Sequence, residues 1–235
     1  MDYRSKNNSK YLMMYHIIFV YNLWCILKGY TFSCKCFRKL EAVRENGEAI
    51  QYICYPSEEV QMAAVKQNAY AIQYIFNPSE KVQLEAVKQN SEAIQYIRNP
   101  SEEAQIEAIK EDHFTIRYIQ CPSIKAQLEA VKQDGRVIIC IHNPSEEVQL
   151  AAVKQNAYAM QYIHNPSDKV KAEAIKHNCE IISKIDNKEE VLLINYNFDA
   201  INFLYEKEFK FSDEFKASEN YKKFEIEKTL EVLED

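Results

Sequence analysis

The chain has 235 residues, 47% of them hydrophobic, and a net charge of −6 at pH 7, which places it among folded globular proteins. Its three glycines, Gly29, Gly47 and Gly135, lie too far apart to form a GxGxxG or GxxxxGK loop, so these common phosphate-binding loops are excluded. A mostly acidic chain also lacks the broad positive field that sequence-independent nucleic-acid binding uses.

The first segment, residues 1–33, contains a 17-residue apolar run from Tyr11 to Leu27 with a lysine on either side. The run is at the short limit for a membrane-spanning helix, and no small-residue cleavage site follows it. His16 and Asn22 inside the run favour burial in protein over burial in lipid. We expect a helix that caps the first repeat, and a membrane or signal segment is the open alternative.

Residues 34–205 repeat with a period of 22. All six prolines follow this spacing, at positions 56, 78, 100, 122, 144 and 166. A fixed period of roughly 20 to 50 residues is typical of architectures in which each unit packs on its neighbours. We therefore expect an all-α fold, an α-solenoid (superhelix) of seven full helix-turn-helix units, from residue 34 onward, and a degenerate unit at 187–204.

Each unit is expected to hold two helices. In one unit Asn77 is a suitable N-cap, Pro78 suits the first helical position and Glu80 can complete a capping box. A helix of about three turns then leads to Asn90, which suits a left-handed C-cap. A second helix of about two turns is expected over residues 91–97.

Four positions in each unit are predicted to face the core. The first helix contributes Ala at 42, 64, 86, 108, 130, 152 and 174, each followed by Val or Ile. The second helix contributes Ile or Met at 50, 72, 94, 116, 138, 160 and 182, and Ile at 53, 75, 97, 119, 141, 163 and 185. An Ala in every unit indicates a close approach of two helix axes.

Beyond the repeats, residues 206–235 are predicted to form one acidic capping helix with a frayed tail.

The stretch NPSEEVQLAAVK at residues 143–154 resembles the leucine-rich variant repeat, and it is still more similar to the AVKQN-type repeats of a domain of unknown function in microbial and phage proteins. The resemblance covers residues 34 to about 204. It implies an α-solenoid and assigns no catalysis. It also suits a phage or viral protein that inhibits a host protein by covering it.

The positions at which similar units disagree lie at the start and the end of the second helix. On a helical wheel the starts lie opposite the core isoleucines and the ends border them, so both series are predicted to form one strip. Aromatic residues and arginine are enriched at interface centres, which favours partner binding over neutral drift on a solvated face. The predicted partner-binding residues are Tyr70, Phe76, Arg98, Phe114, Arg117, Arg136, His142, Tyr158 and His164.

Two further ladders suggest a nucleic-acid track as the alternative. Its residues are Lys66, Lys88, Lys110, Lys132 and Lys154, with Tyr74, Tyr96 and Tyr118. A structural role is favoured for both ladders, because a cation near a helix C-terminus interacts favourably with the helix dipole and a tyrosine ring packs on a solenoid flank.

Catalysis and metal binding are not expected. The sequence contains no Ser/His/Asp, Cys/His or HExxH arrangement, and its seven cysteines, with no CxxC pair, indicate free thiols in the cytoplasm. His142 and His164 occupy equivalent positions about 8–10 Å apart, which is wide for a shared metal. We expect a protein without cofactors that acts as a scaffold or inhibitor of another protein or nucleoprotein. RNA or single-stranded nucleic-acid binding is the alternative, and no membrane partner is expected.

Overall fold

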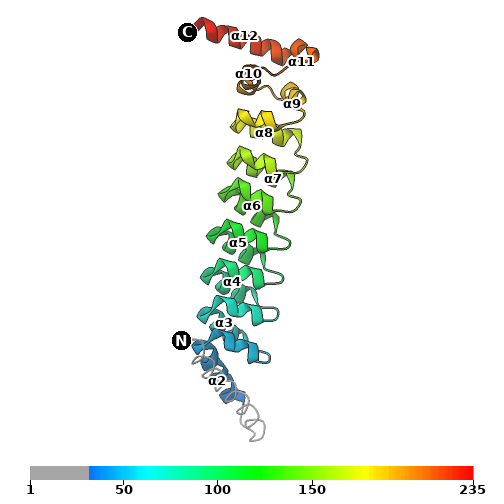
Figure 1. The fold of residues 1–235 in the computed structure, drawn as a ribbon. Helices are drawn as coiled ribbons and strands as arrows, with labels where there is room; N and C mark the ends of the chain where they lie inside the picture. Colours follow the sequence, from blue (N-terminus) through cyan, green and yellow to red (C-terminus); the bar gives the residue numbers. More distant parts are fainter. Residues whose placement is uncertain (1–31, 235) are drawn as a thin grey trace, which may run out of the picture.

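The computed structural model describes residues 32–234, and all regular structure in this range is helical. The units stack into a column (Figure 1). We number them from unit 1 (residues 34–55) to unit 7 (residues 166–187). Their first helices are α2 (Phe32–Glu45), α3 (Glu58–Gln67), α4 (Glu80–Gln89), α5 (Glu102–Glu111), α6 (Ile124–Gln133), α7 (Glu146–Gln155) and α8 (Asp168–His177). Each extensive contact joins elements of the same or of adjacent units, so the predicted solenoid is confirmed.

The second helix of every unit is a six-residue 3-10 helix rather than two turns of α-helix. These helices are η1 (Gly47–Tyr52), η2 (Ala69–Tyr74), η3 (Ser91–Tyr96), η4 (His113–Tyr118), η5 (Gly135–Cys140), η6 (Ala157–Tyr162) and η7 (Cys179–Lys184). Hydrogen bonds that span three residues flank them, as from Ala93 N to Asn90 O at 2.9 Å. A 3-10 helix has three residues per turn, so side chains three positions apart share one edge.

The predicted N-cap of the first helix is wrong, and its C-cap is the predicted residue in a different conformation. The N-cap is Ser79 rather than Asn77, and α4 begins at Glu80 after the proline. Asn77 adopts a left-handed φ of 53°, which Asn tolerates, and turns the chain between η2 and α4. Asn90 is extended, with φ of −154°, and its side chain accepts a hydrogen bond from Glu92 N at 2.9 Å. Asn90 therefore ends α4 and caps η3 in one residue.

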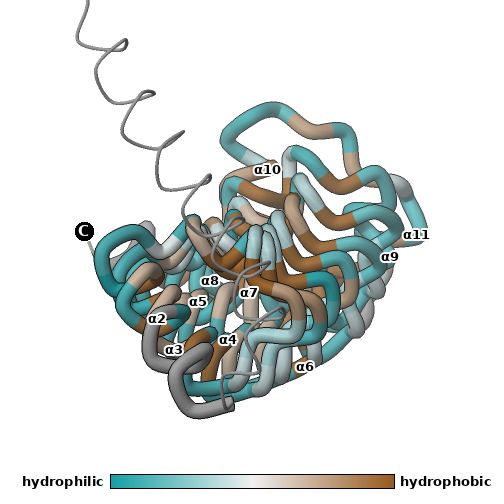
Figure 2. Tube along the Cα trace, turned by 90° about the horizontal axis from the view of Figure 1, so that it is seen from below, coloured by the Kyte–Doolittle hydropathy of each residue, from teal (hydrophilic) through white to brown (hydrophobic). Residues whose placement is uncertain are grey.

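The core follows the predicted ladders. Ala64, Val65 and Ile72 are at most 1% exposed, and the equivalent residues of units 3 to 7 are likewise buried. In Figure 2, seen along the column, hydrophobic positions of successive units lie in rows inside the stack. Only Ala42 and Ile53 of unit 1 are half-exposed. Burial of each aliphatic side chain stabilises the fold by about 1.5 to 3 kcal/mol, so these rows are the main source of stability.

A row of glutamines that the sequence analysis did not single out links the units. Gln83 Nε2 donates to Pro78 O at 2.9 Å, and Gln83 Oε1 accepts from Ser101 N of the next unit at 2.8 Å. Gln105 makes the same two bonds with Pro100 and Ser123, at 3.0 and 2.8 Å. Both side chains are buried, and each bonds through its amide nitrogen and its amide oxygen, so they satisfy backbone groups that the turn would otherwise leave unpaired.

The C-terminal part departs from the prediction of a single helix. The degenerate unit holds α9 (Lys188–Ile194) and α10 (Phe198–Glu206), and α11 (Asp213–Ala217) and α12 (Glu219–Glu234) follow it. Ser212 caps α11 and its Oγ donates to Glu189 Oε2 at 2.5 Å, as Ser79 Oγ does to Glu58 Oε1. The segment therefore starts like a further repeat before it closes the stack with buried Phe215 and Phe224.

The predicted N-terminal cap lies outside the described residues for all but its last two positions. Within residues 32–234, no helix has the length and apolar character needed to cross a bilayer.

Candidate functional site

The second and fifth residues of each 3-10 helix share one edge and form the surface that we call the 3-10 face. From unit 1 to unit 7 the pairs are Glu48 and Gln51, Tyr70 and Gln73, Glu92 and Gln95, Phe114 and Arg117, Arg136 and Ile139, Tyr158 and Gln161, and Glu180 and Ser183. Units 4 to 6 combine apolar and cationic side chains there. Phe114 is 43% exposed, Ile139 63% and Tyr158 41%, so large apolar groups project from three successive units.

The two arginines of this face are held by neighbours in their own units. Arg117 lies over the ring of Tyr118, 4.7 Å from the centroid, and its Nη2 donates to the Tyr118 hydroxyl at 2.8 Å. Arg136 donates to both carboxylate oxygens of Asp134 at 2.9–3.2 Å. These hydrogen bonds hold the pKa of Asp134 below its usual value. Both guanidinium groups are thereby oriented before any partner arrives.

Tyr70, which was predicted to bind a partner, contacts the next unit. Its hydroxyl accepts from Asn90 Nδ2 at 2.8 Å and donates to Glu92 Oε2 at 3.1 Å. Its ring meets the ring of Tyr96 edge-on, with centroids 5.8 Å apart. Burial, followed by the hydrogen bond to Glu92, raises the pKa of Tyr70. Tyr70 therefore also stabilises the junction between units 2 and 3.

The helical-wheel grouping of the second series is wrong, because the 3-10 helices end earlier than expected. Phe76, Arg98, His142 and His164 lie beyond the C-cap isoleucines, in the loops that lead to the next proline. All four are exposed, Phe76 at 94%. They form a separate loop edge and do not continue the 3-10 face.

The two ladders of the nucleic-acid alternative lie at opposite ends of the 3-10 helices. Lys66, Lys88, Lys110, Lys132 and Lys154 are exposed in the last turns of the first helices, just before the 3-10 helices begin. Tyr74 and Tyr96, 40–43% exposed, and half-buried Tyr118 are the last residues of theirs. A six-residue 3-10 helix spans about 12 Å. Each ladder is continuous, but the two do not run side by side.

Apart from Gln161, Ile139 is the residue of the 3-10 face in units 4 to 6 that was not predicted to bind a partner. Its position holds glutamine in units 1, 2, 3 and 6, so the departure was visible in the sequence. Ile139 belongs neither to the series at the start of the second helices nor to the series at their end. In a 3-10 helix it shares an edge with Arg136.

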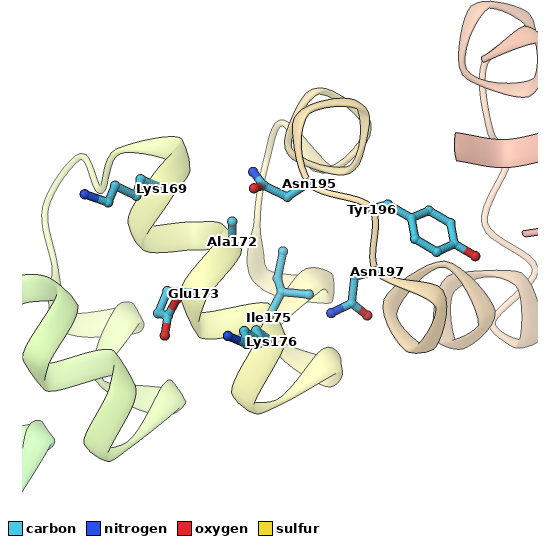
Figure 3. A pocket seen from close by; sticks show the side chains of 8 residues that line it. All are labelled: Lys169, Ala172, Glu173, Ile175, Lys176, Asn195, Tyr196 and Asn197. Atoms are coloured by element: carbon cyan, nitrogen blue, oxygen red, sulfur yellow. The ribbon is translucent and has the colours of Figure 1, made fainter. Parts of the chain in front are cut away.

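A half-open hollow of about 720 Å³ lies between α8 and the linker from α9 to α10 (Figure 3). Lys169, Ala172, Glu173, Ile175 and Lys176 of α8 line one side of it. Asn195, Tyr196 and Asn197 line the other. This hollow was not predicted from the sequence.

Among the described residues no group of three or more His, Cys, Asp or Glu side chains is placed to hold a metal ion, and Cys54, Cys121, Cys140 and Cys179 are free thiols.

None of the protein-family models, curated proteins or solved structures compared with this chain matches it.

Proposed function

We propose that the chain is a non-enzymatic binding protein that holds or occludes another protein, with units 4 to 6 of the 3-10 face as the contact surface. The observation that carries this proposal is the projection of Phe114, Ile139 and Tyr158, 41–63% exposed, beside two oriented arginines. Exposed apolar side chains that cluster on a rigid surface are typical of interaction sites.

The chemistry of this surface favours a partner with apolar and acidic side chains. Rings such as Phe114 and Tyr158 supply contact area at a small loss of conformational entropy, and fixed guanidinium groups bind carboxylates in a defined direction. The acidic positions Glu92 and Glu180 border the central units on the same face. They disfavour a partner that extends its acidic surface past units 4 to 6.

The test is capture of a partner on the immobilised full-length chain from its native source, with and without nuclease, followed by titration of the purified partner. The double variant Phe114→Ala with Arg136→Ala should weaken binding by about 30-fold or more, because such anchors dominate interfaces. The matched control, Glu48→Ala with Glu180→Ala, changes the same face outside the central units and should retain affinity within about threefold. Equal affinity of both variants would disprove the assignment of this surface.

Nucleic-acid binding is the second candidate, and the observation that favours it is the continuous exposure of the lysine ladder. It predicts that changing Lys88, Lys110 and Lys132 together to Gln abolishes an RNA complex whose affinity falls steeply with salt. If nuclease treatment abolishes capture and the triple variant loses affinity, nucleic-acid binding replaces the protein-binding proposal.

A further inference from the structure

The hollow beside α8 coincides with two separate departures from the repeat. The first is length, since α9 has seven residues where the first helices of units 2 to 7 have ten. Three residues of α-helix correspond to about 4.5 Å, nearly one turn. The second is Ala172, whose equivalents are Met62, Leu84, Ile106, Leu128 and Leu150. Both departures remove apolar volume from the same place.

The walls of the hollow are fixed by contacts of their own. Asn197 Oδ1 accepts from Ala200 N at 2.9 Å and caps α10. The Tyr196 hydroxyl donates to Glu227 Oε2 at 2.5 Å, and Lys223 lies over the Tyr196 ring at 4.2 Å from its centroid. The linker is therefore held from the side of α10 and α12, away from α8, and the hollow is a built feature of the fold.

The charges at the rim are positive and unpaired. Lys169 and Lys176 are exposed, and neither lies within ion-pair distance of a carboxylate in the described part of the chain. The one acidic side chain of the lining, Glu173, already faces His177 Nε2 at 3.3 Å and Lys154 Nζ at 4.0 Å. Between the lysines the floor is apolar, with half-exposed Ala172 and buried Ile175.

We infer that this hollow is a docking site for one turn of an amphipathic helix of a partner protein, with a leucine-like side chain over Ala172 and carboxylates toward Lys169 and Lys176. The space is that of the missing helical turn, and the other repeats place Leu, Ile or Met at the position of Ala172. Acidic side chains on the incoming helix complement the two unpaired lysines. This site is separate from the 3-10 face, so it stands or falls independently of the proposed function.

The experiment uses a synthetic capped helical peptide with a central Leu, one Glu four positions before it and one Glu three positions after it. It is titrated into the full-length 15N-labelled protein. We expect saturable shifts of the Ala172, Lys176 and Asn195 amides with a Kd of about 1 mM or tighter. Control peptides with Leu→Ala, or with both Glu→Lys, should bind at least about tenfold more weakly.

Two protein variants locate the site. Ala172→Leu restores the side chain of the other repeats and should abolish the shifts, while Lys169→Glu with Lys176→Glu should weaken binding at least about tenfold. The matched control, Lys88→Glu with Lys110→Glu, reverses two exposed cations outside the hollow and should leave binding unchanged.

Three results would overturn the inference. No saturable shift up to several millimolar peptide would remove the docking site. Binding that is lost in the Lys169/Lys176 variant and kept in Ala172→Leu would show attraction of an anion only. Self-association of the wild-type protein that Ala172→Leu abolishes would show that the occupant is a second copy of this chain.

Discussion

Units 2 and 6 have nearly the same sequence and occupy different surroundings. Residues 56–77 and 144–165 differ only at Met62/Leu150, Ile72/Met160 and Phe76/His164. In both cases the preceding unit has a glycine as the first residue of its 3-10 helix. Gly47 N donates to Gln67 Oε1, and Gly135 N donates to Gln155 Oε1, both at 2.6 Å. Yet Tyr70 is half-buried with a bonded hydroxyl, while Tyr158 is 41% exposed and its hydroxyl has no hydrogen bond in the described part of the chain.

The difference comes from the next unit along the chain. Unit 3 places the ring of Tyr96 edge-on against Tyr70, whereas unit 7 has Lys184 at that position. Asn178 and Glu180 still occupy the positions of Asn90 and Glu92, so the hydrogen-bonding groups alone do not fix the tyrosine. In a stack of repeats, the neighbour therefore decides whether an identical side chain stabilises a junction or faces a partner.

The largest effect should come from the core, where the two units bury different residues at the same position. Ile72 and Met160 are 1% and 6% exposed, so Ile72→Ala and Met160→Ala should each cost about 2–5 kcal/mol of unfolding free energy. Because contacts are confined to neighbours, each variant should also split urea unfolding, followed by circular dichroism, into two steps. Gln73→Ala, at an exposed position, is the control. One sharp unshifted transition in both core variants would contradict the repeat model of stability.

The first residue of the 3-10 helix, which is Gly135 in unit 5 and Ala157 in unit 6, provides a second contrast with a smaller expected effect. A Cβ added at Gly135 would lie 2.3 Å from Ala152 O, so Gly135→Ala should cost about 1–3 kcal/mol through overpacking. At the equivalent position of unit 6, Ala157→Gly should cost about 1 kcal/mol for a different reason, the greater flexibility of the unfolded chain. Thermal melts of both variants test this, and a Gly135→Ala protein as stable as wild type would show that the neighbouring carbonyl moves aside.

The period, the unit boundaries and the buried ladders were predictable because each is repeated in every unit. The proline spacing, as at Pro78, and the core alanine, as at Ala108, recur six and seven times. An ambiguous residue in one unit therefore does not change the prediction. The N-cap was not predictable, since Asn77 and Ser79 both suit this position and only the turn after η2 decides between them. The 3-10 geometry of the second helices was not predictable either, because a six-residue segment fits a 3-10 helix or an α-helix.

The candidate sites were less predictable than the fold, since they depend on exceptions to the repeat. Exposed Ile139 was visible as a departure from Gln, but its pairing with Arg136 requires the three-residue turn. The hollow requires a short α9 and Ala172 at once, and their coincidence appears only when the helices are stacked. The contacts of Tyr70 depend on Tyr96 of another unit in the same way.

The two tyrosines should respond differently to loss of the hydroxyl. Tyr70→Phe removes two hydrogen bonds and should cost about 1 kcal/mol, while Tyr158→Phe should change stability by less than about 0.5 kcal/mol. Lys184→Tyr supplies the missing ring, and in that background Tyr158→Phe should become as costly as Tyr70→Phe. Equal effects of both substitutions in the wild-type background would disprove the role of the neighbouring ring.

The smallest effect is a pH dependence that belongs to Tyr70. Burial and the hydrogen bond to Glu92 raise its pKa in the folded protein above the usual value of 10.0. The neutral hydroxyl therefore contributes its stability in full below pH 10, and that contribution is lost as the pH rises through the folded-state pKa, because the unfolded chain releases the proton first. The stability difference between wild type and Tyr70→Phe, measured by urea unfolding, should thus be constant from pH 7 to pH 9 and should shrink above pH 10. Burial also raises the pKa of Tyr196 and Tyr221, but both proteins retain these residues, so their titration cancels in the difference. A difference that stays constant above pH 10 would show that the Tyr70 hydroxyl titrates as it does in the unfolded chain.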